Sequence, residues 1–217
     1  MKCEAGKWYA VLSSDGVESR KVLHPMPDRE VGIDLGLDSY ATLSTGEKVP
    51  NPRWYRKTEE KLACAQRELS RKERGSPRRA KAKLKVARLH EKARREREDF
   101  QHKLANRLVS EHRLIAAEGL EIQNLIKKCT TGLSKSIQDA AWGSFLSKLA
   151  VKAEEAGRRF VKVPPGGTSS TCWACGAIRP KELSERFHEC PCGFRVDRDL
   201  NASLNILRLG RSLQASA

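Results

Sequence analysis

The sequence predicts an α/β fold in which helices pack on a mixed sheet, with a long basic helical hairpin and a small cysteine module inserted into it. Short apolar runs of strand length are followed by longer runs with helical spacing, the pattern of a layered α/β domain. Residues 53–113 are densely charged, and four cysteines fall between positions 172 and 192. A chain of 217 residues has room for one sizeable domain and a small module.

Short strands are predicted in the first 50 residues. Alternating and β-branched residues at 7–13 and 18–23, separated by a Ser-Asp-Gly turn, predict a β-hairpin. Three further strands, antiparallel to one another, are predicted at 30–36, 40–44 and 48–49. The first of these three is apolar except for one acidic residue.

A basic helical hairpin is predicted next. Residues 53–113 hold 21 Lys and Arg against 9 Asp and Glu, which is +12 of the net charge of +15. Apolar residues recur at helical spacing, and Gly75-Ser76-Pro77 interrupts them. So much positive charge favours a polyanionic partner, most commonly nucleic acid. The candidate contacts are Arg71, Lys72, Arg74, Arg78, Arg79, Lys81, Arg88 and Arg95.

The second half of the chain alternates strand and helix. A short strand is predicted at 114–120, followed by one amphipathic helix from Ser134, as its N-cap, to Gly157, as its C-terminal stop. A strand at 159–163 precedes the cysteine module. A closing helix is predicted at 197–209, ending at Gly210.

Three acids stand out because each interrupts an apolar or helical context. Asp34 and Glu118 lie in short apolar strands, where burying an unpaired carboxylate costs several kcal/mol. Asp199 opens the closing helix, where Asp197 competes with it for the role of N-cap or ligand. Carboxylate oxygens suit Mg²⁺, and two such ions can hold the attacking water and the leaving oxygen of a phosphodiester. For each acid alone, a solvated or capping role is the commoner alternative.

The cysteine pattern predicts a structural zinc site. Cys172-Trp-Ala-Cys175-Gly and Cys190-Pro-Cys192-Gly supply four thiolates, the ligand set of a closed tetrahedral site. The second pair has one intervening residue rather than two, which brings its two cysteines closer together along the chain. His188 is a possible substitute ligand, although an exposed loop histidine is the simpler interpretation.

Membrane insertion is not expected. Mean hydropathy is −0.60, and no stretch reaches the ~18 apolar residues of a membrane span. The N-terminal residues lack the apolar core of a signal peptide. We therefore expect a soluble protein of the cytoplasm, associated with the nucleoid, with no membrane partner.

Seven ordered segments resemble the TnpB family of transposon-encoded, RNA-guided DNA nucleases, relatives of the type V CRISPR effectors. The resemblance covers almost the whole chain, from about residue 7 to residue 210. Its segments are GIDLG at 32–36, LSRK at 69–72 with Gly75-Ser76, EGLEI at 118–122, LSKSIQDAAW at 133–142, KAE at 152–154, TSSTC at 168–172 and DRDLNASLN at 197–205.

The resemblance implies a RuvC-like nuclease domain of ribonuclease H fold, with Asp34, Glu118 and Asp199 as its catalytic, metal-binding acids. Mg²⁺ or Mn²⁺ would serve at that site and structural Zn²⁺ at the cysteines, with DNA and a guide RNA as partners. The implied organisation is a residual β-hairpin of an N-terminal barrel at 1–29, the nuclease domain at 30–164 and 196–210 with the basic insertion at 53–113, a target-binding zinc ribbon at 165–195, and a tail at 211–217.

The chain also departs from the family pattern. Only about thirty residues precede Asp34, where family members carry a recognition domain. The expected protein partner is a second chain that supplies that half, or alternatively another copy of this chain in a homodimer. Gly119 stands where an acid is common in the family. Two alternatives to a guided endonuclease remain: a non-cleaving module that binds guide RNA or DNA and regulates transposition, and an unguided nickase of single-stranded DNA.

Overall fold

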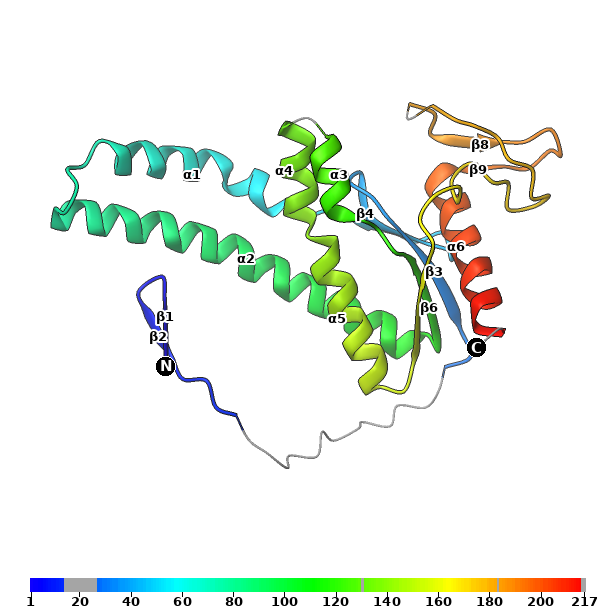
Figure 1. The fold of residues 1–217 in the computed structure, drawn as a ribbon, viewed down its shortest axis with the longest axis horizontal. Coiled ribbons are helices and arrows are strands. Elements are labelled where there is room, and N and C mark those ends of the chain that lie inside the picture. The colour runs from blue at the N-terminus through cyan, green and yellow to red at the C-terminus, as the bar shows by residue number, and fades with distance from the viewer. Residues whose placement is uncertain (14–26, 130, 183, 216–217) are drawn as a thin grey trace. The chain divides into compact units, whose positions relative to one another are not determined.

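The computed structural model describes residues 1–13, 27–129, 131–182 and 184–215. The chain divides into two units. The first comprises Met1–Lys21 and Arg53–Gln101, and the second comprises Val22–Pro52 and His102–Ala217. Figure 1 shows the elements of each unit along the chain.

The N-terminal hairpin of the first unit differs from the predicted one. Strand β1 (Lys2–Glu4) pairs antiparallel with β2 (Lys7–Tyr9). Ala5 and Gly6 turn the chain with φ of 48° and 79°, values typical of a tight two-residue hairpin turn. The predicted strand at 7–13 is therefore shorter and pairs with the residues before it. Its predicted partner at 18–23 lies outside the described residues.

The basic segment forms the predicted pair of helices, α1 (Trp54–Ser70) and α2 (Pro77–Glu111), and α2 continues into the second unit. The turn between them has local causes. Gly75 has a φ of 86°, and Ser76 Oγ accepts the backbone N–H of Arg79 at 3.2 Å as an N-cap. Two of the apolar residues at helical spacing in this segment, Leu62 and Ala65, are buried. Trp54 and Phe100 also meet edge to face, with ring centroids 5.2 Å apart.

A five-stranded mixed sheet organises the second unit. Its order is β5-β4-β3-β6-β7, in which β3, β6 and β7 are parallel and β4 and β5 are antiparallel additions. The antiparallel trio and the mixed α/β class were predicted correctly. The strands are β3 (Glu30–Leu35), β4 (Ser39–Leu43), β5 (Lys48–Pro50), β6 (Leu114–Glu118) and β7 (Arg159–Val163).

Helix α6 (Arg198–Ala215) lies directly on one face of this sheet because two glycines allow close approach. A Cβ added to Gly32 would stand 2.1 Å from the Ser203 carbonyl oxygen, and one added to Gly210 would stand 2.5 Å from Ala116 Cβ. Gly210 was predicted to end the helix. The helix instead continues through Gly210 into the predicted tail. The glycine is needed there because a side chain would collide with Ala116.

The helical layer on the other side of the sheet contains α3 (Ile122–Lys128), α4 (Thr131–Ala140) and α5 (Trp142–Glu155) (Figure 1). The single helix predicted from Ser134 is thus two, broken at Ala141, whose φ is 48°. The buried Tyr40 hydroxyl donates to the Ala140 carbonyl oxygen at 3.2 Å, a contact 100 residues away in sequence. Ser134 is no N-cap; its Oγ donates to carbonyl oxygens of the preceding turn. Gly157, with φ of 66°, follows the end of α5 as predicted.

The cysteine module precedes α6 and contains the antiparallel strands β8 (Phe187–Glu189) and β9 (Arg195–Asp197). Strand β9 continues into α6 without a loop, so the module and the last helix form one continuous segment. Among the described residues, no helix is both long and apolar enough to span a membrane.

Candidate active site and metal centre

Asp34 and Glu118 come together because each lies near the C-terminal end of one of two adjacent parallel strands. Ile33 pairs with Ala117, so the residue after each stands side by side at the carboxyl edge of the sheet. Side chains alternate along a strand, so Asp34 shares a face with Gly32, and Glu118 shares one with Ala116. Gly32 and Ala116 both touch α6, so the two carboxylates point to the α6 face.

Asp199 joins them from the first turn of α6. Ser203, one helical turn later, contacts β3 at Gly32. The neighbouring Asp197 is the N-cap: its Oδ1 accepts the backbone N–H groups of Asp199 at 3.0 Å and Leu200 at 3.2 Å, and its Oδ2 pairs with Lys48 Nζ at 2.7 Å. Of the two aspartates, Asp197 therefore takes the capping role.

The carboxyl of Asp34 lies within electrostatic range of the other two acids. Burial raises the pKa of its carboxyl well above the ordinary value, and the negative charges of Asp199 and Glu118 raise it further. Arg198 acts in the opposite direction and lies 3.2 Å from Asp199 Oδ1. The cluster therefore holds more negative charge than its surroundings compensate, an arrangement that favours binding of a cation.

Sequence reasoning gave no role to Thr168, whose hydroxyl donates to Glu118 Oε1, or to Asn201 and Asn205, which hold the Thr168 segment. The two asparagines are buried beneath the segment from Thr168 to Trp173, which they bind. Two asparagines four apart share one face of a helix, and that spacing is the signal that would have identified them.

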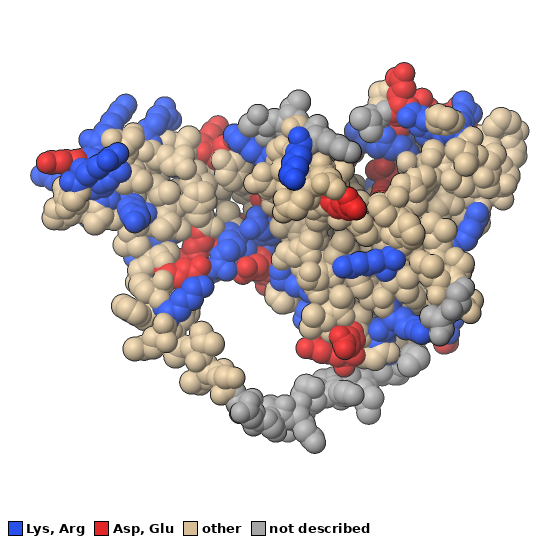
Figure 2. All heavy atoms as spheres, in the orientation of Figure 1, with Lys and Arg blue, Asp and Glu red and all other residues tan. Residues whose placement is uncertain are grey.

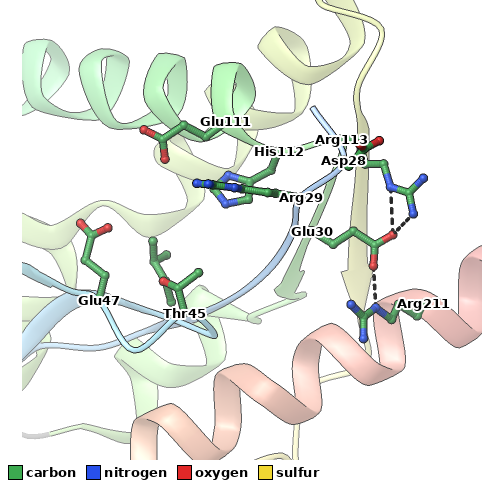
Figure 3. Close-up of a pocket in the computed structure, with 10 residues that line it drawn as sticks. Asp28, Arg29, Glu30, Thr45, Glu47, Glu111, His112, Arg113 and Arg211 are labelled. Atoms are coloured by element: carbon green, nitrogen blue, oxygen red, sulfur yellow. Dashed lines mark hydrogen bonds and ion pairs between the residues drawn. The ribbon is translucent and has the colours of Figure 1, made fainter. Parts of the chain in front are cut away.

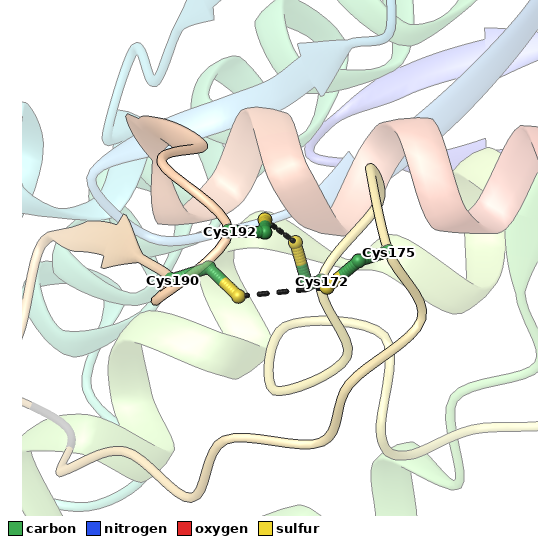
Figure 4. A group of neighbouring side chains, drawn as sticks. All are labelled: Cys172, Cys175, Cys190 and Cys192. Carbon is green, nitrogen blue, oxygen red and sulfur yellow. Dashed lines mark hydrogen bonds between the residues drawn. The ribbon is translucent and has the colours of Figure 1, made fainter.

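The four cysteines gather in one place (Figure 4). Their sulfur atoms all lie within 4.8 Å of one another, with 3.8 Å between Cys172 and Cys192 and 3.6 Å between Cys175 and Cys190. Four thiolates about 2.3 Å from a tetrahedral ion are about 3.8 Å apart. The cysteines are therefore close enough to bind a metal ion, and the shortened second pair takes part in the cluster.

His188 lies beside this cluster and is fully buried in β8, so the interpretation as an exposed loop histidine was wrong. Burial alone would raise the pKa of the Cys172 thiol. The backbone N–H groups of Cys175 and Ala174 and the adjacent His188 ring outweigh that effect and lower it to about 6. A thiol that ionises so readily is suited to metal binding.

The basic candidates in the first unit divide into two groups. Arg79 donates to the carbonyl oxygens of Leu69 at 3.0 Å and Lys72 at 2.8 Å, which caps the end of α1, and Arg95 contacts Tyr9 and Glu91. These two have partners within the fold, and Arg88 Nε donates to the Ala5 carbonyl oxygen at 3.4 Å. The side chains of the six other than Arg79 and Arg95 are exposed, and Figure 2 shows Lys and Arg gathered where α1 meets α2; the six are Arg71, Lys72, Arg74, Arg78, Lys81 and Arg88.

A groove of about 770 Å³ runs along this hairpin. The basic residues Lys72, Arg78, Lys81 and Arg88 line it, and Leu84 contributes an apolar floor. The combination suits a polyanion that also presents apolar surface.

A second pocket, of about 520 Å³, opens at the amino edge of the sheet, away from the three acids. Figure 3 shows its central feature: Glu30 accepts from Arg113 at 2.8 Å and from Arg211 at 2.5 Å. This network ties the start of β3 to the start of β6 and to the last turns of α6. The charge of Glu30 therefore pairs with those of Arg113 and Arg211 within the protein.

Comparison with known proteins gives consistent matches along the chain. A family model described as "Probable transposase" matches residues 17–128, and one described as "Cas12f1-like, TNB domain" matches residues 142–206. A "Putative RNA-guided DNA endonuclease" of Streptomyces pristinaespiralis is 43% identical over 98% of this chain and 52% of its own length. Its counterpart InsQ of Escherichia coli K12 is 33% identical over 97% of this chain and 56% of its own length. The chain thus spans about half the length of these relatives.

Two solved structures share the fold. One, titled as a Cas12f1-sgRNA-target DNA complex, superposes with a TM-score of 0.58 at 20% identity, covering 84% of this chain and 50% of its own. A CRISPR-Cas12f ternary complex superposes with a TM-score of 0.55 at 22% identity, covering 84% and 40%. At these identities the likeness is one of fold.

Proposed function

The chain belongs to the TnpB family, and on that premise we propose that it is a divalent-metal-dependent DNA endonuclease that acts under an RNA guide. The observation that carries this proposal is the convergence of Asp34, Glu118 and Asp199 at one edge of the sheet, where burial and then the charges of Asp199 and Glu118 raise the pKa of Asp34. The sheet order, with two antiparallel strands beside three parallel ones, supports a ribonuclease H-like, RuvC-type nuclease domain at 30–164 and 196–210.

The three carboxylates fit Mg²⁺ or Mn²⁺, which prefer oxygen ligands. Bound there, a pair of such ions would activate water and stabilise the leaving oxygen of a phosphodiester. The chain's own residues prepare the site. Thr168 holds one oxygen of Glu118, Asp197 fixes the start of α6 so that Asp199 faces the strands, and Arg198 offsets part of the negative charge.

The cysteine cluster fits Zn²⁺ in a closed four-thiolate site, a structural role with no position open for catalysis. We assign residues 165–195 to a zinc ribbon that binds target nucleic acid. The exposed basic residues of the α1–α2 hairpin would bind phosphates without regard to sequence, while base pairing to a guide RNA would supply specificity. The printed names of the relatives, which describe RNA-guided DNA endonucleases, support both partners.

A cleavage assay tests the proposal. Supercoiled plasmid and single-stranded DNA are incubated with the full chain and Mg²⁺, with and without co-purified RNA. Asp34→Ala and Glu118→Ala should lower cleavage at least about 100-fold, because losing even an outer partner of a metal ligand costs about 10–100-fold. Asp38→Ala is the matched control, since its carboxylate is 68% exposed. Equal cleavage by all four proteins would overturn the proposal.

A non-cleaving nucleic-acid-binding module is the second candidate, favoured by the basic groove of the hairpin. The same experiment separates the two candidates. DNA or RNA binding by the wild type, with no Mg²⁺-dependent cleavage under any condition, would establish the binding module. Cleavage of single-stranded DNA alone, independent of RNA, would indicate an unguided nickase.

A further inference from the structure

Thr168 occupies a position between the two proposed metal sites. It is 6% exposed and lies five residues after the end of β7 and four before Cys172. Its hydroxyl donates to Glu118 Oε1 across 50 residues of sequence. A carboxylate with one oxygen engaged in this way keeps a fixed orientation and leaves its other oxygen for a second partner.

Two asparagines of α6 fix the backbone around Thr168. Asn201 Nδ2 donates to the carbonyl oxygens of Thr168, Ser169 and Thr171, at 3.3, 3.3 and 2.8 Å. Asn205 Nδ2 donates to those of Thr168 and Thr171, at 2.9 and 2.7 Å. Both amides are at least 96% buried, where an unsatisfied polar group is costly, so the segment and the helix require one another.

Asn201 also makes a hydrogen bond to the cysteine module. Asn201 Oδ1 accepts the backbone N–H of Trp173 at 3.1 Å, the residue directly after Cys172. Cys172 is itself buried and closes its own turn, its N–H donating to the Ala177 carbonyl oxygen at 2.8 Å. A path of hydrogen bonds therefore runs from Trp173, the neighbour of the buried Cys172, through Asn201 and Thr168 to Glu118.

We propose that Thr168 is a positioning residue for Glu118, and that Asn201 and Asn205 make the hydrogen bond between Thr168 and Glu118 depend on an intact cysteine site. The inference rests on the proposed function and adds to it. Metal bound at the cysteines then strengthens metal binding at the carboxylates, although the cysteines take no part in the chemistry. Outer partners that orient a ligand are worth about 10–100-fold in metal affinity.

The first arm of the test measures Mn²⁺ affinity of the zinc-loaded full chain by titration calorimetry. Thr168→Val, which keeps the shape and removes the donor, should weaken affinity about 10–100-fold, and Thr168→Ser should restore it to near the wild-type value. Ser170→Ala is the matched control, because it removes a hydroxyl from the same loop that donates only to Gly167. Thr168→Ala removes the same donor with less bulk, in case valine disturbs the loop.

The second arm tests the coupling. Cys175→Ser should weaken Mn²⁺ affinity in the wild-type background and have little further effect in Thr168→Val, because residues on one path are non-additive. Mn²⁺ binding by Thr168→Val and Thr168→Ala equal to that of the wild type would overturn the positioning role. Additive effects of Cys175→Ser and Thr168→Val would overturn the coupling.

Asp34→Asn separates this inference from the proposed function. If Asp34→Asn binds Mn²⁺ as the wild type does, the carboxylate site itself is wrong. If Asp34→Asn loses binding while the Thr168 variants keep it, the site stands and only the role of Thr168 is overturned.

Discussion

Gly32→Ala is expected to force α6 away from the sheet. The added methyl carbon would stand 2.1 Å from the Ser203 carbonyl oxygen and 2.7 Å from the Leu207 backbone nitrogen. Non-bonded atoms prefer roughly 3.5 Å, so the helix must move by about 1 Å, and neither obstacle is a side chain that can rotate aside. Overpacking of this kind costs about 1–3 kcal/mol, and backbone obstacles place this case at about 3 kcal/mol.

A loss of about 3 kcal/mol corresponds to a fall in Tm of roughly 6–12 °C for a chain of this size. Thermal denaturation followed by circular dichroism measures it. Gly132→Ala is the matched control, because Gly132 is an exposed helical residue with open space around it, and its Tm should be unchanged or slightly raised. A Gly32→Ala protein whose Tm is within about 2 °C of the wild type would refute the close packing of α6 on β3. It would also refute the expectation that α6, and Asp199 with it, must move away from the sheet.

Three further outcomes are expected. Burial would raise the pKa of Glu30, but Arg211 and Arg113 lower it below the ordinary value of 4.5. The stability that ionised Glu30 gives the folded protein is therefore full above pH 4.5 and is lost as the pH falls through the lowered pKa. The Tm of Glu30→Gln should drop less on acidification than that of the wild type, and parallel plots of Tm against pH for the two proteins would contradict this. Cys175→Ser should lose most bound zinc and the thiolate-to-Co²⁺ absorption of the cobalt form, and unchanged zinc content would exclude a four-cysteine site. Arg78→Glu combined with Lys81→Glu should reduce the slope of log binding constant against log salt concentration for DNA binding by about 2. Arg79→Ala, which removes the cap of α1, should mainly lower Tm. A double variant with the same slope as the wild type would place the DNA interface elsewhere.

Much of the site was predictable from the sequence because isolated acids in apolar strands are expensive. Asp34 and Glu118 were identified on that ground, and the strand register brings them together. Asp199 could not be separated from Asp197 by pattern, since either can cap a helix. Only the hydrogen bonds from Asp199 and Leu200 to Asp197 assign the cap.

Three of the failures of prediction share a physical cause: each depends on a contact far away in sequence. The break at Ala141 involves neither glycine nor proline, and it lies beside the buried hydroxyl of Tyr40. Gly210 has the local signature of a helix end but serves contact with Ala116. Thr168 is one polar residue among several in its loop, and only its distance from Glu118 in the folded chain distinguishes it.

The close approach of α6 to the sheet separates two kinds of evolutionary constraint. Gly32 and Gly210 are required by packing whether or not the protein cleaves anything, whereas Asp34, Glu118 and Asp199 add repulsion that the fold alone would not select. A paralogue that keeps both glycines but has lost the acids is therefore expected to fold and to bind its partners without cutting. The glycines would then be shared by all members with this fold, and the acids only by members with the proposed cleavage chemistry.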